Sequence, residues 1–390
     1  MRICMVTSHI PPYQSANAIL PQLLASRLKE DGHEVSFIIP EKALNSAMKK
    51  EMDYPAFVIR VPHRRKRIAA IIKIDSLFVF LSIYKQVKSV LNDVDIVHIH
   101  SNGLLHQAAA VAARRSKIPV ILTHYGTEIW HYKKRKLPLP DLFKYMNSIS
   151  AFVTYYSKML MDYSFRLGII PKNPVTIYPP AGKEFRILND LERQAIRKEL
   201  GIETENMLVN VKRLHPLGGH EFLIRAMPEV LQKHPNTKLY ICGTGELYGD
   251  LEKLKNSLGL DGKVELLGMI NNELIWKYYA AADLYVLSSV LEALPTVVIE
   301  ALACGTPVVM TETPGGKELI ELFPEDIRLV ELRNPEKMAQ AVMGFLSNKR
   351  RVTNATSDVV DKLFRTDYIY KKYLNLYKRA IEGLRNENNR

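Results

Sequence analysis

The sequence is poor in cysteine and has no long apolar segment. Its three cysteines among 390 residues, Cys4, Cys242 and Cys304, fall in predicted strands or at a helix end. Their odd number and their spacing argue against a disulfide framework and a cysteine metal site, so we expect buried free thiols in a reducing compartment. No uninterrupted apolar run is long enough to span a bilayer, and the N-terminus reads as a strand rather than a signal peptide. We therefore expect a cytoplasmic protein.

Excess positive charge is confined to the N-terminal half. Residues 1–190 contain 27 lysines and arginines against 14 aspartates and glutamates, whereas residues 191–390 contain 27 of each. This asymmetry predicts an anionic partner for the first half: a membrane surface, a phosphorylated acceptor or a nucleic acid. The basic runs lack a recognisable nucleic-acid-binding module, so we expect no nucleic acid. The length predicts two or three domains, and 47% apolar residues suffice for full cores.

The most informative segment lies between residues 284 and 310. The apolar run 284–287 predicts a buried parallel strand, residues 296–303 predict a short helix, and Gly305 fits a left-handed helix end before the next strand, 308–310. Glu292 lies in the loop and Glu300 on the helix. Free N–H groups at the start of that helix, Thr296 and Val297, suit a phosphate, and carboxylates accept hydrogen bonds from sugar hydroxyls. This is the chemistry that a nucleotide-sugar requires.

Glu292 and Glu300, with seven residues between them and followed by Ala-Leu-Ala-Cys-Gly-Thr-Pro-Val-Val, resemble the signature of retaining family 4 glycosyltransferases of group 1. The alternative is an ordinary strand–helix–strand corner with a surface glutamate. The resemblance implies an α/β protein of GT-B architecture, with two Rossmann-like domains facing across a cleft. It also implies a nucleotide-diphosphate sugar as co-substrate and neither cofactor nor metal.

The resemblance also assigns roles in the second domain. Arg213 would contact the diphosphate, Glu292 the sugar hydroxyls and Glu300 the ribose hydroxyls. Glycine 218 stands where the family has a lysine, so that cation is missing unless Lys212, His215 or His220 replaces it, although the amides of Gly218 and Gly219 offset part of the loss. The remaining predicted donor contacts are Gly243, Gly245, Met269, Ile270, Thr296 and Val297.

In the first domain, the resemblance places a loop histidine, His124, against the donor sugar as a hydrogen-bond donor or charge stabiliser. The alternative is a loop histidine that caps a helix. The loop after the first strand usually carries a Gly-Gly pair in this family, and here Ser15 and Ala16 take its place, which puts close approach of the donor phosphates in doubt. We predict His9, Ser15, Ala16 and Glu128 on the acceptor side.

We expect an N-terminal domain at 1–185, a nucleotide-sugar domain at 186–365 and a helix at 366–390 that returns to the first domain. The proline-rich stretch 171–180 is interpreted as the linker, 313–316 as a glycine loop and Asp93-Val-Asp95 as the start of a strand rather than a metal site. The basic cluster 63–67 before the apolar stretch 76–84 fits either a membrane-surface segment or a solvated loop followed by a core helix. Tyr370, Tyr373 and Tyr377 are interpreted as a packed helical stripe.

These patterns together predict a retaining enzyme that moves a sugar to a hydroxyl acceptor. Lipid-linked and cell-envelope precursors are candidate acceptors, with the protein peripheral on the inner face of the membrane. Attack from the same face, assisted by the phosphate, is favoured because no second carboxylate can be assigned below the anomeric carbon. The alternatives are a non-catalytic sugar-nucleotide-binding partner subunit and a phosphorylase or epimerase of the same fold.

Overall fold

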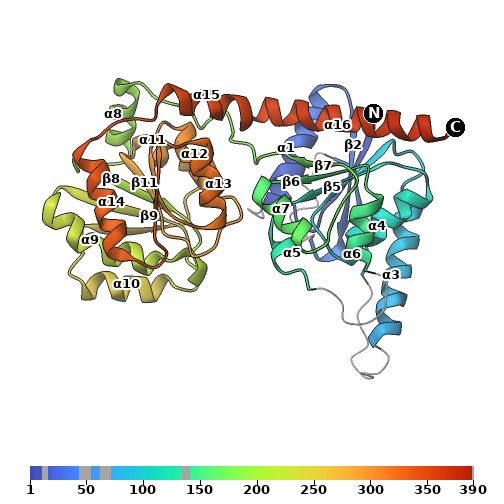
Figure 1. The fold of residues 1–390 in the computed structure, drawn as a ribbon, viewed down its shortest axis with the longest axis horizontal. Coiled ribbons are helices and arrows are strands. Elements are labelled where there is room, and N and C mark those ends of the chain that lie inside the picture. The colour runs from blue at the N-terminus through green and yellow to red at the C-terminus, as the bar shows by residue number, and fades with distance from the viewer. Residues whose placement is uncertain (11–15, 44–53, 62–71, 134–140, 389–390) are drawn as a thin grey trace. The chain divides into compact units, whose positions relative to one another are not determined.

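The computed structural model describes residues 1–10, 16–43, 54–61, 72–133 and 141–388. They form two compact units (Figure 1). Unit 1 comprises Met1–Tyr178 and Ile369–Arg390, and unit 2 comprises Pro179–Tyr368. The expected boundaries at 185/186 and 365/366 lie close to these divisions. Ser15, the basic cluster 63–67 and the basic residues 134–136 lie outside the described residues.

Unit 1 is built on a parallel sheet. Its order is β3-β2-β1-β4-β5-β6-β7, and every pairing is parallel. The central strands are buried along nearly their whole length because helices cover both faces, which explains their continuous apolar runs. The strands are β1 (Arg2–Val6), β2 (Glu34–Pro40), β3 (Ala56–Ile59), β4 (Ile96–His100), β5 (Val120–His124), β6 (Phe152–Tyr155) and β7 (Pro174–Thr176).

The helices of unit 1 pack on this sheet around an apolar core that includes Val97, Ile99 and Leu122. Alanine-rich α4 packs against α3, since its small side chains let the two helices approach closely. The helices are α1 (Ala16–Glu30), α3 (Ile72–Ser89), α4 (Leu104–Arg115), α5 (Thr127–Trp130), α6 (Leu142–Ile149), α7 (Lys158–Arg166) and the part of α16 (Thr366–Asn388) from Ile369 onwards.

Helix α16 is tied to unit 1 by buried tyrosines. Tyr377 shares a 2.7 Å hydrogen bond with Nδ1 of His98, and the Tyr373 hydroxyl lies 3.2 Å from Oγ1 of Thr154 and 3.3 Å from that of Thr123. Tyr370 donates to Asp31 beyond the end of α1. The tyrosine stripe therefore packs and hydrogen-bonds within the fold.

Unit 2 repeats the arrangement with six parallel strands in the order β10-β9-β8-β11-β12-β13. Its core lies between the sheet and the helices α9 and α14 and includes Leu208, Leu239 and Val286. The strands are β8 (Asn206–Val211), β9 (Thr237–Cys242), β10 (Val264–Gly268), β11 (Leu284–Leu287), β12 (Val308–Thr311) and β13 (Ile327–Val330). The helices are α8 (Asp190–Glu199), α9 (His220–Lys233), α10 (Tyr248–Ser257), α11 (Asn272–Ala281), α12 (Thr296–Ala303), α13 (Pro314–Leu322), α14 (Pro335–Ser347) and α15 (Asn354–Leu363), with a short 3-10 turn, η3 (Pro216–Gly218).

The structure confirms some of the local predictions and corrects others. The segment 284–310 has the predicted strand, helix and strand, and Gly305 adopts a left-handed φ of 79° after α12. The three cysteines are free and buried. The proline-rich stretch 171–180 contains the division between the units, at Tyr178 and Pro179, but Pro174–Thr176 within it form edge strand β7. One interpretation is wrong: 314–316 are the first residues of α13, capped by Thr313, rather than a loop.

In both sheets the strand order reverses at the first strand. The crossover in unit 1 lies between β1 and β4, and in unit 2 between β8 and β11. In open parallel sheets, ligands bind beyond the carboxyl ends of the strands at such a reversal, because the connections leave in opposite directions there and open a crevice. Functional side chains are therefore expected in the loops after these four strands.

Candidate functional site

In unit 2, the loops after β8 and β11 carry a charged pair at the strand reversal. The Lys212 ammonium forms an ion pair with the Glu292 carboxylate, although 80 positions separate them in sequence. The main chain also joins the two loops, since Val290 N–H donates to the Leu217 carbonyl at 2.8 Å and Ser288 Oγ to the Gly218 carbonyl at 3.0 Å. The predicted Glu292 thus stands at the reversal, held by a lysine.

The glycines of these loops permit close main-chain packing. A Cβ on Gly219, whose φ is +61°, would lie 2.1 Å from the Ser288 carbonyl oxygen, and one on Gly243 would lie 2.0 Å from that of Lys212. At Gly245 the corresponding distance, to the Leu214 carbonyl, is 2.2 Å. No real Cβ is tolerated so close, so these glycines hold the β8 loop against its neighbours.

Helix α12 begins beside Glu292 without a side-chain cap. Its N-cap is Pro295, and within the described residues no side chain accepts from its first N–H groups. Thr296 and Val297 are only partly buried. Orphan N–H groups and the helix dipole make such an end suited to an anion.

Glu300 lies in a different environment from Glu292. It accepts a 2.9 Å hydrogen bond from the Tyr279 hydroxyl and is half-buried. Burial raises the pKa of this carboxyl to about 7, an effect that the Tyr279 hydrogen bond partly opposes. The carboxyl can therefore change protonation near neutral pH when a ligand hydroxyl reaches it.

Two further predicted donor residues, Arg213 and Met269, lie at the surface of unit 2, whereas Gly218 does not. The Arg213 side chain is 75% exposed and lies 3.8 Å from Glu246 in a loose ion pair, which leaves its guanidinium available to an anion. Met269 is exposed after β10, followed by half-buried Ile270. Gly218 is buried and packs against the ring of His220.

In unit 1, His124 is buried at the end of β5, and both ring nitrogens are engaged. Nδ1 lies 3.2 Å from Oε1 of Glu128 and Nε2 lies 2.9 Å from Oδ1 of Asn147. Glu128 also accepts from the Tyr125 N–H at 2.6 Å. Burial alone would raise the pKa of Glu128, but the bonds from His124 and the main chain hold it below its usual value. The pair is an ionised carboxylate fixed by a histidine.

The strand reversal of unit 1 contains a histidine that sequence reasoning missed. His106, on α4, is buried with Nε2 3.5 Å from Ser8 Oγ, and Nδ1 lacks a partner among the described residues. Nearby Ser101 takes a left-handed φ of 87° that serine rarely adopts. The only sequence signal was the strand ending before it. His9 contacts Asn17 at 3.2 Å, and Ala16 is the first residue of α1.

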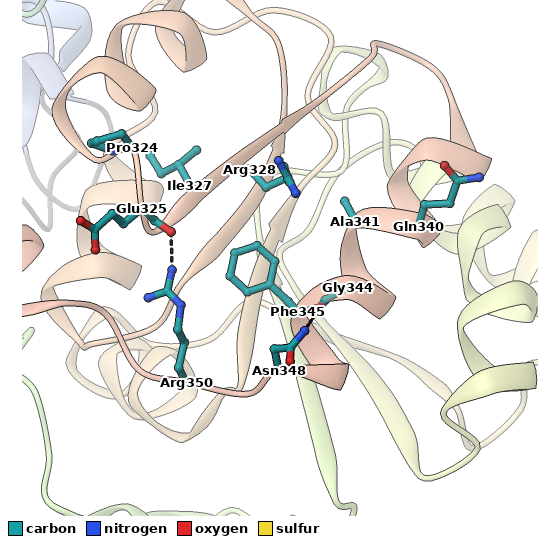
Figure 2. A pocket seen from close by; sticks show the side chains of 10 residues that line it. All are labelled: Pro324, Glu325, Ile327, Arg328, Gln340, Ala341, Gly344, Phe345, Asn348 and Arg350. Atoms are coloured by element: carbon teal, nitrogen blue, oxygen red, sulfur yellow. Dashed lines mark hydrogen bonds between the residues drawn. The ribbon is translucent and has the colours of Figure 1, made fainter.

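A hollow on unit 2 lies away from the predicted donor residues. Figure 2 shows it beside β13 and α14, with the Arg350 guanidinium bound to the Glu325 carbonyl. Arg350 also pairs with the buried Asp326. This cation is therefore occupied by its own unit, and the lining includes none of the predicted site residues. The lining residues are Pro324, Glu325, Ile327, Arg328, Gln340, Ala341, Gly344, Phe345, Asn348 and Arg350.

The described part of the chain shows neither a metal-binding cluster nor a membrane-spanning helix. Within the described ranges, no group of three or more histidine, cysteine, aspartate or glutamate side chains is placed to hold a metal ion. Asp93 and Asp95 instead bind Arg2 of β1, each with a 3.2 Å ion pair. None of the described helices combines the length and apolarity needed to cross a bilayer.

Comparisons with known proteins agree with this geometry. Residues 192–358 match the family model described as glycosyl transferases group 1, and residues 22–181 match glycosyltransferase family 4. An uncharacterised glycosyltransferase of Methanocaldococcus jannaschii is 30% identical, over 98% of this chain and 99% of its own. The alpha-monoglucosyldiacylglycerol synthase of Streptococcus pneumoniae is 26% identical over 82% of this chain and 73% of its own.

Among solved structures, an Anabaena protein in complex with UDP has a TM-score of 0.73 at 18% identity, and the match covers 96% of this chain and 99% of that one. At this identity the likeness supports the fold. The family models, the full-length relative and the two Rossmann-like units agree with one another. The chain therefore belongs to the group 1 glycosyltransferases of family 4 type, with the GT-B fold.

Proposed function

We propose that the protein transfers a sugar, with retention of anomeric configuration, from a nucleotide-diphosphate sugar to a hydroxyl acceptor. The observation that carries this is the Lys212–Glu292 pair at the strand reversal of unit 2, next to the uncapped start of α12. A cation and free amides suit a diphosphate, and a fixed carboxylate suits sugar hydroxyls. The Anabaena neighbour with bound UDP supports a nucleotide in this fold.

The proposed chemistry follows from the charge that develops on the leaving group. The bond between the anomeric carbon and the diphosphate oxygen breaks, the acceptor oxygen bonds to the same face of that carbon, and the acceptor proton passes to the departing diphosphate. Arg213 and the amides of Thr296 and Val297 would stabilise the diphosphate, so the proposal requires no metal. Glu292 would hold sugar hydroxyls and Glu300 the ribose hydroxyls.

We assign His124 a positioning role. Its two ring nitrogens are committed to Glu128 and Asn147, so a direct bond to the donor sugar would require exchange of one of them. As placed, the ring orients Glu128, whose carboxylate is the group suited to accept from a hydroxyl. Glu128 and His9 remain our acceptor-side residues in unit 1.

We further propose an acceptor presented at an anionic membrane surface, reached through α3. Leu77 and Phe78 are 57% and 66% exposed there, Leu81 is also exposed, and Lys85 and Lys88 follow on the same helix. Apolar side chains beside lysines are what interfacial binding needs. The Streptococcus pneumoniae relative, named for the synthesis of a glucosylated diacylglycerol, supports a lipid acceptor.

The test measures turnover of UDP-, GDP- and ADP-sugars. The measured quantity is the nucleoside diphosphate released, with and without lipid acceptors. We expect release by the wild type and at least a 100-fold loss in Glu292→Ala and Arg213→Ala variants that keep the wild-type melting temperature. Wild-type turnover in either variant would remove its residue from the site. Nucleotide binding without release, for every donor and acceptor, would instead identify a non-catalytic binder.

A further inference from the structure

Tyr279, on α11, has a fully buried side chain whose position is fixed from several sides. Its ring packs against the ring of Phe185, with centroids 5.9 Å apart, and against that of Tyr285, with centroids 5.5 Å apart. Its main-chain carbonyl accepts a 2.7 Å hydrogen bond from the Thr306 hydroxyl, just after α12. The phenol hydroxyl therefore has one direction in which to point, which is toward α12.

That hydroxyl holds one of the two carboxylate oxygens of Glu300. It donates to Oε2 at 2.9 Å, whereas no described residue donates to Oε1, which is not fully buried. A free glutamate side chain samples several rotamers, and a carboxylate fixed beforehand binds a ligand without that entropic cost. Because tyrosine is neutral, the carboxylate also keeps its charge for a ligand hydroxyl. Oε1 is therefore accessible, oriented and charged when the carboxyl is ionised.

Few other titratable groups face Glu300. They are Tyr285 on β11, Cys304 at the end of α12 and the exposed Glu184, whose charge opposes ionisation of Glu300. Burial raises the pKa values of Tyr285 and Cys304 well above their usual range, as it does for Tyr279. Within the described residues, Tyr279 is thus the group that hydrogen-bonds to Glu300, and it remains a donor throughout the neutral pH range.

We propose that Tyr279 is a positioning residue of the donor site: it fixes Oε2 of Glu300 so that Oε1 is presented to the ribose hydroxyls, and it thereby sets the selectivity for ribonucleotide donors. This rests on the function proposed above, in which Glu300 holds the ribose. Tyr279 itself does not contact the ligand, and its effect passes entirely through Glu300.

The experiment measures this selectivity by calorimetry. It takes whichever of UDP, GDP and ADP binds most tightly, together with its 2′,3′-dideoxy counterpart, which lacks both ribose hydroxyls. The wild type should bind the ribonucleotide about 10- to 100-fold more tightly, and Glu300→Ala should remove that preference. Tyr279→Phe should lower it about 3- to 10-fold, with a higher KM for the donor and an unchanged kcat, because the ribose is remote from the bond that breaks.

The pH dependence of the preference distinguishes positioning from packing. In the wild type, the preference should increase as the pH rises through about 7, because the hydroxyls bind the ionised carboxylate. The Tyr279 hydrogen bond lowers the pKa of Glu300, so its removal raises that pKa. In Tyr279→Phe the increase should therefore occur at a higher pH. A loss of packing alone would weaken both nucleotides equally and leave the midpoint where it was.

Tyr285→Phe is the matched control. Tyr285 is an equally buried tyrosine beside Tyr279, but its hydroxyl donates to the Val211 carbonyl, at 3.2 Å, so its removal should leave the preference unchanged. Phe185→Leu is a second variant, which loosens the Tyr279 ring and keeps its hydroxyl. It should lower the preference less than Tyr279→Phe does. Neither Tyr279→Phe nor Phe185→Leu should have a further effect on the preference in a Glu300→Ala background.

Three results would overturn this inference while sugar transfer stands. They are a wild type without preference for the ribonucleotide, a Tyr279→Phe variant with unchanged preference and midpoint, and a loss of preference that is as large without the Glu300 carboxylate as with it. Failure of the wild type to bind any of the nucleotides would instead overturn the proposed function.

Discussion

Glu292 and Glu300 show that equal side chains in one motif can have unequal chemistry. Glu292 is held by a lysine cation, whereas the nearest polar partner of Glu300 is the Tyr279 hydroxyl. Because burial raises the pKa of Glu300 to about 7, the folded protein holds a proton that an unfolded glutamate, with a pKa near 4.5, would release. Donor hydroxyls that bind the carboxylate form would therefore expel a proton near neutral pH.

This predicts a pH-dependent effect of Glu300→Gln on stability. The folded-state pKa is raised, so the wild type has its full stability below about pH 4.5 and loses it as the pH rises through about 7. Relative to wild type, the variant should gain about 3 kcal/mol at pH 8 and less than about 1 kcal/mol at pH 5. Urea unfolding at both pH values measures this. Glu273→Gln is the control, because Glu273 is an exposed glutamate at the start of α11. An equal change in stability at both pH values for Glu300→Gln would contradict the raised pKa.

A second residue-scale prediction concerns Gly218. Gly218→Ala should destabilise unit 2 by about 1–3 kcal/mol, because the added Cβ overlaps the buried His220 ring. His220→Ala should remove most of that penalty in the double variant, so thermal unfolding should show strong coupling. Gly249→Ala, where nothing lies within 4 Å, should cause no loss. Additive effects at 218 and 220 would contradict the packing.

At the scale of the element, α3 is expected to carry membrane binding. Replacing Leu77, Phe78 and Leu81 with serine removes exposed apolar area and should reduce sedimentation with phosphatidylglycerol vesicles at least tenfold. Binding to neutral phosphatidylcholine vesicles should be weak, and binding to the anionic ones should fall with salt. Leu191→Ser is the control, because this leucine is more exposed than the three α3 residues but lies on α8 of unit 2. If the triple variant sediments like the wild type, membrane binding depends on the basic residues alone or on another surface.

At the scale of the molecule, α16 is expected to stabilise unit 1 selectively. Tyr377→Phe leaves Nδ1 of the buried His98 without its 2.7 Å partner, which should cost about 1–3 kcal/mol. The unfolding transition of unit 1 should move to lower temperature, while nucleotide binding by unit 2 stays unchanged. Tyr368→Phe, at the end of unit 2, provides the comparison. A loss of nucleotide affinity in Tyr377→Phe would contradict the prediction that this part of α16 stabilises unit 1 alone.

The sequence predicted regular elements better than their contacts. The strand 284–287 was located correctly from its apolar run, and the helix 296–303 from the glycine that follows its end. Strand β7 was missed because Pro174 reads as linker, yet proline is tolerated on an edge strand, which needs fewer N–H donors. The start of α13 was missed because Gly315 and Gly316 are typical of a loop, although Thr313 and Pro314 before them are typical of a helix start.

The candidate site was only partly predictable for a related reason. Glu292 stood out through its motif, but its pairing with Lys212 depends on which strands are neighbours, and local pattern does not give strand order. The Tyr279 bond that helps set the pKa of Glu300 joins two helices and left no signal in the spacing. The burial of His124 likewise follows from packing around β5.

Unit 1 is discontinuous in the chain, since residues 369–390 complete it after all of unit 2. On the ribosome, the residues of unit 2 therefore emerge in full before the buried partners of His98 and Thr123 exist. Unit 1 cannot complete its fold until α16 is synthesised, and until then His98 and Thr123 lack their tyrosine partners. Truncated translation products should accordingly contain a folded second half attached to an aggregation-prone first half.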